Sequence, residues 1–300
     1  MSPELRPTQG PRLLRKLTAN DSWIQKAYVL VAKAGREISS DTLRDHVVAQ
    51  ANRVQAEILS ALPASDAKVR PIDGEKAAVL EEYIAENNGG LIVMRHGIQY
   101  VEDDTRKVLI DPVRKIRLMQ MPFNHQDPAD AQSLAEAAGL ALVLNFISRE
   151  HNIPIDIRTS QNTRAADIAA ILSVVNGFQV AEDSRLTCVN YPSDRTDEEL
   201  ERLLGENSGG ALVFKREILD AVCGEGTYDR LTDDVNSLVT QYRNGGKLVI
   251  ALTHTPQTNA ADVMAGDAPV RMPELGFRIF TRNRSTQFLQ NIFGGSSISV

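Results

Sequence analysis

Two short apolar runs constrain the fold of this chain more than any other feature. LIVM (91–94) follows Asn-Asn-Gly-Gly, and KLVIAL (247–252) follows Asn-Gly-Gly. Neither run alternates polar and apolar residues, which is typical of strands in a sheet that is covered on both faces. Each Asn-Gly-Gly is typical of a helix that ends in a tight turn. We therefore predict two buried strands, each entered from a helix.

Helical patterns fill much of the chain between these runs, and a further strand candidate, IPIDIRTS (153–160), lies among them. The patterns cover residues 130–150, 163–176, 196–207 and 227–246. Alternation of strands and helices predicts an α/β fold: a three-layer α/β/α sandwich with a mostly parallel central sheet. In such sheets ligands bind at the carboxyl ends of the strands.

The N-terminal part of the chain does not alternate in this way. Apolar stripes at helical spacing cover residues 23–34 and 43–62, and Asp73 is a candidate N-cap for a third helix that ends before Gly89. Residues 63–74 are predicted as a linker or loop. We therefore divide the chain into a helical N-terminal extension, 1–88, and an α/β domain, 89–300. The extension is open to three roles: a lid over the site, a docking segment, or the dimerisation element of a homo-oligomer.

Composition excludes several classes of protein. The 300 residues carry a net charge of −6, which is not the basic balance expected of a nucleic-acid-binding protein. Two cysteines, Cys188 and Cys223, are too few for a disulfide framework. No apolar run approaches the length of a membrane span, and the N-terminus lacks the apolar core of a secretory signal. We expect a cytoplasmic protein with no membrane or nucleic-acid partner.

Polar residues stand where the predicted strands end. LIVM runs into Arg95 and His96, IPIDIRT is followed by Ser160 and Arg164, and KLVIALT ends at His254. A helix can begin at Thr255-Pro256. Arginine donors and a helix N-terminus both favour a phosphoryl group. One imidazole can attack phosphorus, and the other can stabilise the charge that develops on its oxygens. These residue types predict a site for a small phosphorylated substrate.

Three blocks of the sequence resemble motifs of the histidine phosphatase superfamily, also called phosphoglycerate mutase-like. They are MRHG (94–97), S-x-x-x-R-A (160–165) and the apolar strand that ends at His254. The resemblance covers about residues 89–265, and it implies a metal-independent phosphatase that needs no cofactor. His96 would be the nucleophile that forms a phosphohistidine intermediate. Arg95, Arg164 and His254 would form the phosphate pocket, with the backbone of Thr255 assisting.

The chain departs from the family pattern at the general acid, which protonates the leaving oxygen. Cys188 stands where many members carry a glutamate, and Thr255 stands where another branch carries an aspartate. A thiol with a pKa of about 8.5 is a poor proton donor compared with a tuned carboxylic acid. Three outcomes are open. A carboxylate such as Glu182, Asp183 or Glu225 reaches the site, the substrate has a good leaving group, or catalysis is weak or lost.

Two hypotheses follow from these observations. The first is a phosphohydrolase that removes a phosphoryl group from a small phosphorylated metabolite through His96. The second is a catalytically weak or inactive protein of the same fold that serves as a phosphate-ligand-binding or assembly module. The pattern Arg95, His96, Arg164 and His254 favours the first, because a module without catalysis has no chemical need for all four.

Overall fold

The computed structural model describes most of the chain between residues 21 and 294. The described ranges are 21–38, 43–61, 69–96, 129, 131–175, 177–187, 216–269, 272–282, 287–289 and 292–294. The predicted helix at 196–207 lies outside these ranges, and so does Cys188, which stands where a general acid would be expected.

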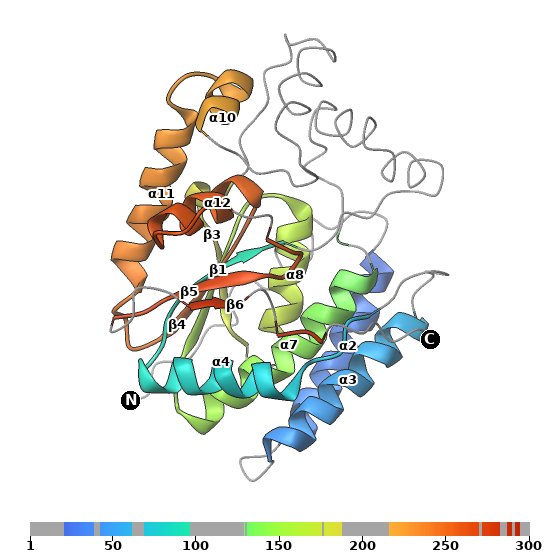
Figure 1. Cartoon of the computed structure of the whole chain (residues 1–300). Coiled ribbons are helices and arrows are strands. Elements are labelled where there is room, and N and C mark those ends of the chain that lie inside the picture. Colours follow the sequence, from blue (N-terminus) through green and yellow to red (C-terminus); the bar gives the residue numbers. More distant parts are fainter. Residues whose placement is uncertain are drawn as a thin grey trace, which may run out of the picture.

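A six-stranded sheet forms the centre of the protein, with the strand order β3-β2-β4-β1-β5-β6 (Figure 1). The strands are β1 (Gly90–Arg95), β2 (Ile155–Thr159), β3 (Gln179–Glu182), β4 (Leu248–Thr253), β5 (Phe277–Phe280) and β6 (Gln287–Leu289). The two apolar runs form β1 and β4, which are neighbours in the sheet. The α/β class predicted from the sequence is therefore confirmed.

The sheet is mixed, so the expectation of a mostly parallel sheet is met among β1 to β4 and not at the β5–β6 edge. Strands β1 to β4 are joined by parallel pairs, whereas β5 runs antiparallel to β1, and β6 antiparallel to β5. The sequence did not single out 277–280 or 287–289 as strands. Both are short, and β5 contains Arg278, a charge that breaks the apolar pattern of a buried strand.

Helices cover both faces of the sheet (Figure 1). They are α2 (Asp21–Glu37), α3 (Arg44–Ala61), α4 (Gly74–Glu86), α7 (Ala131–Glu150), α8 (Thr163–Ser173), α10 (Arg216–Cys223), α11 (Thr227–Tyr242) and α12 (Thr255–Met264). On β1, Ile92 and Met94 join the core formed with α7 and α8, whereas Leu91 and Val93 join the core formed with α11 and α12. Burial on both faces explains why this strand does not alternate polar and apolar residues.

The N-terminal helices share a core with the sheet. Apolar residues of α2, α3 and α4 belong to the same buried cluster as α7 and β1. Asp73 caps α4 as predicted, because its carboxylate accepts hydrogen bonds from the backbone N–H groups of Glu75 and Lys76. The division of the chain between residues 88 and 89 stays a prediction.

Among the described helices, α7 is long and apolar enough to cross a membrane by length and composition. No segment of this kind was expected from the sequence. However, 89% of its apolar window is buried inside the protein, where α7 packs against α2, α3 and α8. Packing in the core therefore accounts for its composition.

The turn before β1 depends on glycine. Gly89 has a φ of 105°, and a Cβ on it would lie 2.2 Å from the carbonyl oxygen of Lys247. The close approach exists because the backbone N–H of Gly90 donates to that same carbonyl, at 2.9 Å. The Asn-Asn-Gly-Gly sequence therefore fixes where β1 begins beside β4.

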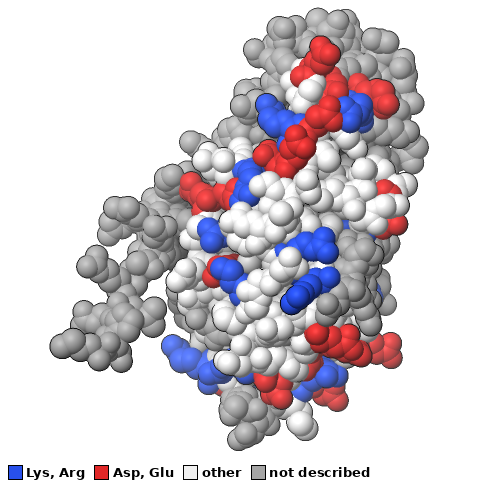
Figure 2. Space-filling view, turned by 90° about the vertical axis from the view of Figure 1, so that its left-hand side faces the viewer, with Lys and Arg blue, Asp and Glu red and all other residues white. Residues whose placement is uncertain are grey.

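Acidic and basic side chains lie intermixed on the face shown in Figure 2. An ion pair joins α10 to α11, where the two terminal nitrogens of Arg216 donate to the carboxylate of Asp229 at 2.6 and 2.5 Å. Because opposite charges in contact partly cancel, such pairs weaken the electrostatic field of the protein at a distance.

Candidate active site at the carboxyl ends of β1, β2 and β4

Three polar residues follow directly after three neighbouring parallel strands. In the register of the sheet, Arg95 of β1 lies beside Thr253 of β4, and Thr159 of β2 lies beside Leu252 of β4. The next residues along each strand are His96, Ser160 and His254, so they lie at one edge of the sheet. Parallel pairing thus brings together residues that are far apart in the sequence.

The two histidines are in contact. The backbone N–H of His96 donates to the carbonyl of Thr253 at 2.9 Å, which extends the pairing of β1 with β4 by one residue. The ring centroids of His96 and His254 lie 4.7 Å apart, with the ring planes inclined by 56°. Both side chains are buried. Two imidazoles at this separation can act on one group bound beside them.

Ser160 contacts His254 from the β2 side. Its hydroxyl lies 2.9 Å from Nε2 of His254, and its backbone N–H donates to the carbonyl of Leu252 at 3.1 Å. The hydroxyl also accepts a hydrogen bond from the backbone N–H of Asn162, at 3.2 Å. A hydroxyl can donate to a neutral imidazole nitrogen or accept from a protonated one, so this contact suits either charge state of His254. The sequence pattern contained Ser160 but did not assign it this contact.

A helix begins at the site. His254 is the N-cap of α12, Thr255 is its first residue, and Pro256 follows in the first turn. Proline is favoured there because its missing N–H is one that no helical carbonyl would accept. The predicted helix start is therefore confirmed. The N-terminus of a helix presents backbone N–H groups and a partial positive charge, which favour an anion.

Arg164 lies in the first turn of α8, directly after β2. It is buried, with an exposed fraction of 8%. The neighbouring carboxylate of Asp167 is also buried and accepts a hydrogen bond from the backbone N–H of Ala129, at 2.9 Å. The structure therefore places a buried cation at the same edge of the sheet as the two histidines.

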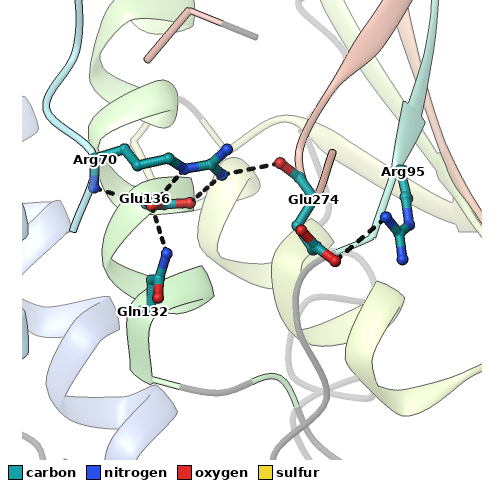
Figure 3. Close-up of polar contacts among 5 residues, drawn as sticks. All are labelled: Arg70, Arg95, Gln132, Glu136 and Glu274. Atoms are coloured by element: carbon teal, nitrogen blue, oxygen red, sulfur yellow. Dashed lines mark hydrogen bonds and ion pairs between the residues drawn. The ribbon is translucent and has the colours of Figure 1, made fainter. Parts of the chain in front are cut away.

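Arg95 binds the turn that leads into β5. One terminal nitrogen donates to the carbonyl of Met272 at 2.6 Å and lies 3.2 Å from Oε1 of Glu274 (Figure 3). Glu274 was not singled out from the sequence, because PELG resembles an ordinary turn. A carboxylate beside the arginine expected to bind phosphate is the main feature of the site that could not be predicted from the sequence.

The three carboxylates considered as substitutes for the general acid are either exposed or have a lowered pKa. Glu182 and Glu225 are exposed. Burial raises the pKa of Asp183, but hydrogen bonds from the side chain and backbone of Arg185 outweigh burial, and the net pKa is lowered. A carboxyl group whose pKa is lowered is ionised at neutral pH, so it rarely carries the proton that a general acid must donate.

The segment that leads to Cys188 is held beside the site. The hydroxyl of Thr253 donates to the carbonyl of Leu186 at 3.0 Å, and the side chain of Gln257 donates to the carbonyl of Thr187 at 2.7 Å. Leu186 ends the short 3-10 turn η1 (Ser184–Leu186), which follows β3. The chain therefore passes the end of β4 immediately before Cys188.

Within the described part of the chain, no group of three or more histidine, cysteine, aspartate or glutamate residues is arranged to hold a metal ion. Metal-independent chemistry stays a prediction. The site is defined instead by imidazole, guanidinium and hydroxyl groups and by the first turn of α12.

Comparisons with known proteins assign the chain to no family. No protein-family model matches it, and no curated protein matches its sequence. Among solved structures, it is similar to one titled "Mycobacterial hydrolase 1", with 16% identity and a TM-score of 0.40. That likeness covers 66% of this chain and 95% of the other. A likeness this distant carries no argument about activity.

Proposed function

We propose that this protein is a phosphohydrolase of the histidine phosphatase type, with a phosphoglycerate mutase-like fold, acting on a small phosphorylated metabolite. The observation that carries the proposal is the contact between His96 and His254, with ring centroids 4.7 Å apart at the ends of adjacent strands β1 and β4. This contact joins two of the three sequence blocks that resemble the family. Ser160, which begins the remaining block, S-x-x-x-R-A, is hydrogen-bonded to His254.

The proposed reaction proceeds through a covalent intermediate on His96. An imidazole nitrogen attacks phosphorus, a P–N bond forms, and the bond from phosphorus to the leaving oxygen breaks. The leaving oxygen takes a proton from an acid or from water. Water then attacks phosphorus, a P–O bond forms and the P–N bond breaks, while one proton of the water passes to a base or to solvent. Inorganic phosphate is released and His96 is restored. Burial of both histidines limits the access of competing water until the substrate is bound.

The remaining residues have supporting roles in this proposal. Arg95 and Arg164 donate hydrogen bonds to the phosphoryl oxygens, and His254 stabilises the negative charge that develops on them. The backbone N–H groups at the start of α12, Thr255 included, add donors from the helix N-terminus.

The surroundings of Asp183 favour a substrate with a good leaving group. The carboxylate of Asp183 is engaged by Arg185, and the other two substitutes, Glu182 and Glu225, are exposed. An anhydride or a phosphoramidate depends less on a proton donor than an alkyl ester does, because its leaving group is more stable as an anion or carries its own proton. We therefore expect anhydrides and aryl phosphates to be turned over faster than alkyl phosphates.

The test is release of phosphate from a panel of aryl phosphates, alkyl phosphates and anhydrides, by the wild type and by His96→Ala. Turnover that His96→Ala abolishes supports the proposal, and a rapid-quench assay with labelled substrate should trap an acid-labile phosphoenzyme. Turnover that His96→Ala retains would exclude a phosphohistidine on this residue.

Because no general acid has been identified among the described residues, the second hypothesis, a binding or assembly module, is tested in the same experiments. A protein that binds phosphate or vanadate at the His96–His254 site but releases no phosphate from any substrate would be a binding or assembly module. Robust turnover that depends on His96 would exclude this alternative. Cytoplasmic location and a homo-oligomer formed through the N-terminal helices remain proposals, to be tested by fractionation and by the mass in solution.

A further inference from the structure

We propose that Glu274 and Arg70 are positioning residues that hold the Arg95 guanidinium in place beside His96. The inference rests on the proposed function, because it concerns the arginine assigned to phosphate binding. It also gives part of the N-terminal extension a role that differs from the three considered above. The contacts form one continuous chain of hydrogen bonds and ion pairs (Figure 3).

The first link joins Arg95 to the turn at residues 272–276. Besides the side-chain contacts to Met272 and Glu274, the backbone N–H of Arg95 donates to the carbonyl of Gly276 at 2.9 Å. The backbone N–H of Leu275 donates back to the carbonyl of Arg95 at 3.2 Å. Both the main chain and the side chain of Arg95 are therefore bound to this one turn.

The turn has a backbone conformation that needs support. Leu275 is fully buried and has a φ of 55°, which is uncommon for a residue with a branched side chain. Such conformations persist where the surrounding structure fixes them. The position of Glu274, one residue earlier, therefore depends on what holds the turn.

The second link joins this turn to the extension. A terminal nitrogen of Arg70 donates to the backbone carbonyl of Glu274 at 3.0 Å. The same guanidinium donates to both carboxylate oxygens of Glu136 on α7, at 2.9 and 2.6 Å. Glu136 is buried and also accepts from the backbone N–H of Arg70 and from the side chain of Gln132, each at 3.0 Å.

Arg70 is itself fixed on its other side. Its guanidinium lies over the ring of Phe293, 4.8 Å from the centroid. The neighbouring Pro71 accepts a hydrogen bond from the backbone N–H of Gly294, at 2.7 Å, and Ile72 forms a bridge with Phe293. Residues 69–73 are thus held between α7, the 272–276 turn and the C-terminal segment 292–294.

In this geometry, Glu274 fixes the guanidinium of Arg95 before phosphate binds. An arginine loses rotamer freedom when it binds phosphate, and contacts that fix its side chain beforehand reduce that loss. The carboxylate of Glu274 fixes one end of the guanidinium of Arg95, and Arg70 fixes Glu274 through its backbone. Both act through Arg95, so neither needs to touch the substrate.

The test compares Glu274→Ala with Glu274→Gln, which keeps a hydrogen-bond acceptor for Arg95. The first readout is the side-chain Nε–Hε NMR signal of Arg95, assigned by its loss in Arg95→Lys. The second is the affinity for inorganic phosphate, with kcat and KM for an aryl phosphate. We expect Glu274→Ala to shift or broaden the signal and to lower affinity for phosphate about 10- to 100-fold, and Glu274→Gln to restore most of both.

Arg70→Ala would leave the buried Glu136 without its cation and is prone to unfold, so the second variant is Arg70→Met/Glu136→Met. Replacing both members of a buried ion pair by apolar residues of similar size is generally tolerated. The variant retains the Glu274 side chain, so a change in the Arg95 signal reports the loss of support. The control is Arg216→Ala, which breaks the exposed pair with Asp229 and should change neither readout.

Unchanged NMR signals and phosphate affinities in Glu274→Ala and in the double variant would overturn this inference and leave the proposed function standing. If the wild type neither binds phosphate nor turns over any substrate, the proposed function fails instead. In that case the Arg95 signal still decides the inference, because it reports the guanidinium without any ligand.

Discussion

The hydroxyl of Ser160 lies 2.9 Å from Nε2 of His254 and accepts a hydrogen bond from the backbone N–H of Asn162. Ser160 and His254 follow neighbouring parallel strands, β2 and β4, whose register brings their ends together. The hydroxyl is buried and is also held by the backbone N–H of Asn162, so its contact with Nε2 favours one orientation of the imidazole. Ser160 therefore fixes the orientation of the ring that contacts His96.

Ser160→Ala tests this relationship. The variant removes a hydrogen bond that contributes a net free energy of about 1–1.5 kcal/mol. Because the ring of His254 is then no longer held, kcat for an aryl phosphate should fall about tenfold. Ser173→Ala is the matched control, because the Ser173 hydroxyl bonds only locally, to the carbonyl of Ala170 in the same helix. Equal kcat values in the two variants would show that Ser160 does not orient His254.

The part of the fold that surrounds the site could be predicted because the sequence there is locally consistent. Apolar runs without alternation identify β1 and β4, and Thr255-Pro256 identifies the start of α12. The motifs at these strand ends then named His96 and His254 before their contact was known. Each of these features lies within a few residues of the chain.

The contacts around Arg95 could not be predicted, because they join segments with no local signal. Arg70 lies in a stretch that resembles a linker, and Glu274 in a stretch that resembles a turn. Glu136 lies in an apolar helix, where a glutamate is more often exposed. Only the tertiary structure places these three charged residues in one chain of contacts.

Glycine at the start of β1 gives a prediction about stability. Gly89→Ala should lower the free energy of unfolding by about 3–4 kcal/mol, because the residue has a positive φ and the new Cβ would overlap the Lys247 carbonyl. In the control Gly246→Ala, φ is also positive, at +60°, but the nearest atom lies 3.8 Å from the Cβ. That variant should lose about 1–2 kcal/mol. Similar losses in urea unfolding would contradict the predicted clash.

Stability should depend on pH through Asp183. Its pKa is lowered in the folded protein, so its contribution is complete above the unfolded pKa of about 3.9 and is lost as the pH falls through the folded value. At pH 7, Asp183→Asn should cost about 1–2 kcal/mol, because the charged hydrogen bonds with Arg185 are weakened. Urea unfolding should give a smaller difference from the wild type at pH 3. A difference that stays constant from pH 7 to pH 3 would disprove the assignment.

The buried ion pair between Arg278 and Asp262 holds α12 against β5. Arg278→Met should destabilise the protein by about 3–5 kcal/mol, because it leaves the carboxylate of Asp262 buried without its cation. Arg278→Met/Asp262→Leu should recover most of that loss, since no buried charge is then left without a partner. The other carboxylate that pairs with Arg278, that of Asp267, is exposed and stays hydrated. If thermal unfolding shows the double variant to be no more stable than the single one, the cost lies in lost packing rather than in the unpaired charge.

The central claim is that His96 carries a phosphoryl group during catalysis. The most direct test is to mix the wild type and His96→Ala with a labelled aryl phosphate, and to follow both the phosphate released and the label retained on protein quenched in alkaline detergent. We predict an early burst of acid-labile, alkali-stable phosphoprotein and steady release in the wild type, with both absent in His96→Ala. Phosphate release by His96→Ala at the wild-type rate, or turnover in the wild type without any phosphoprotein, would contradict the account.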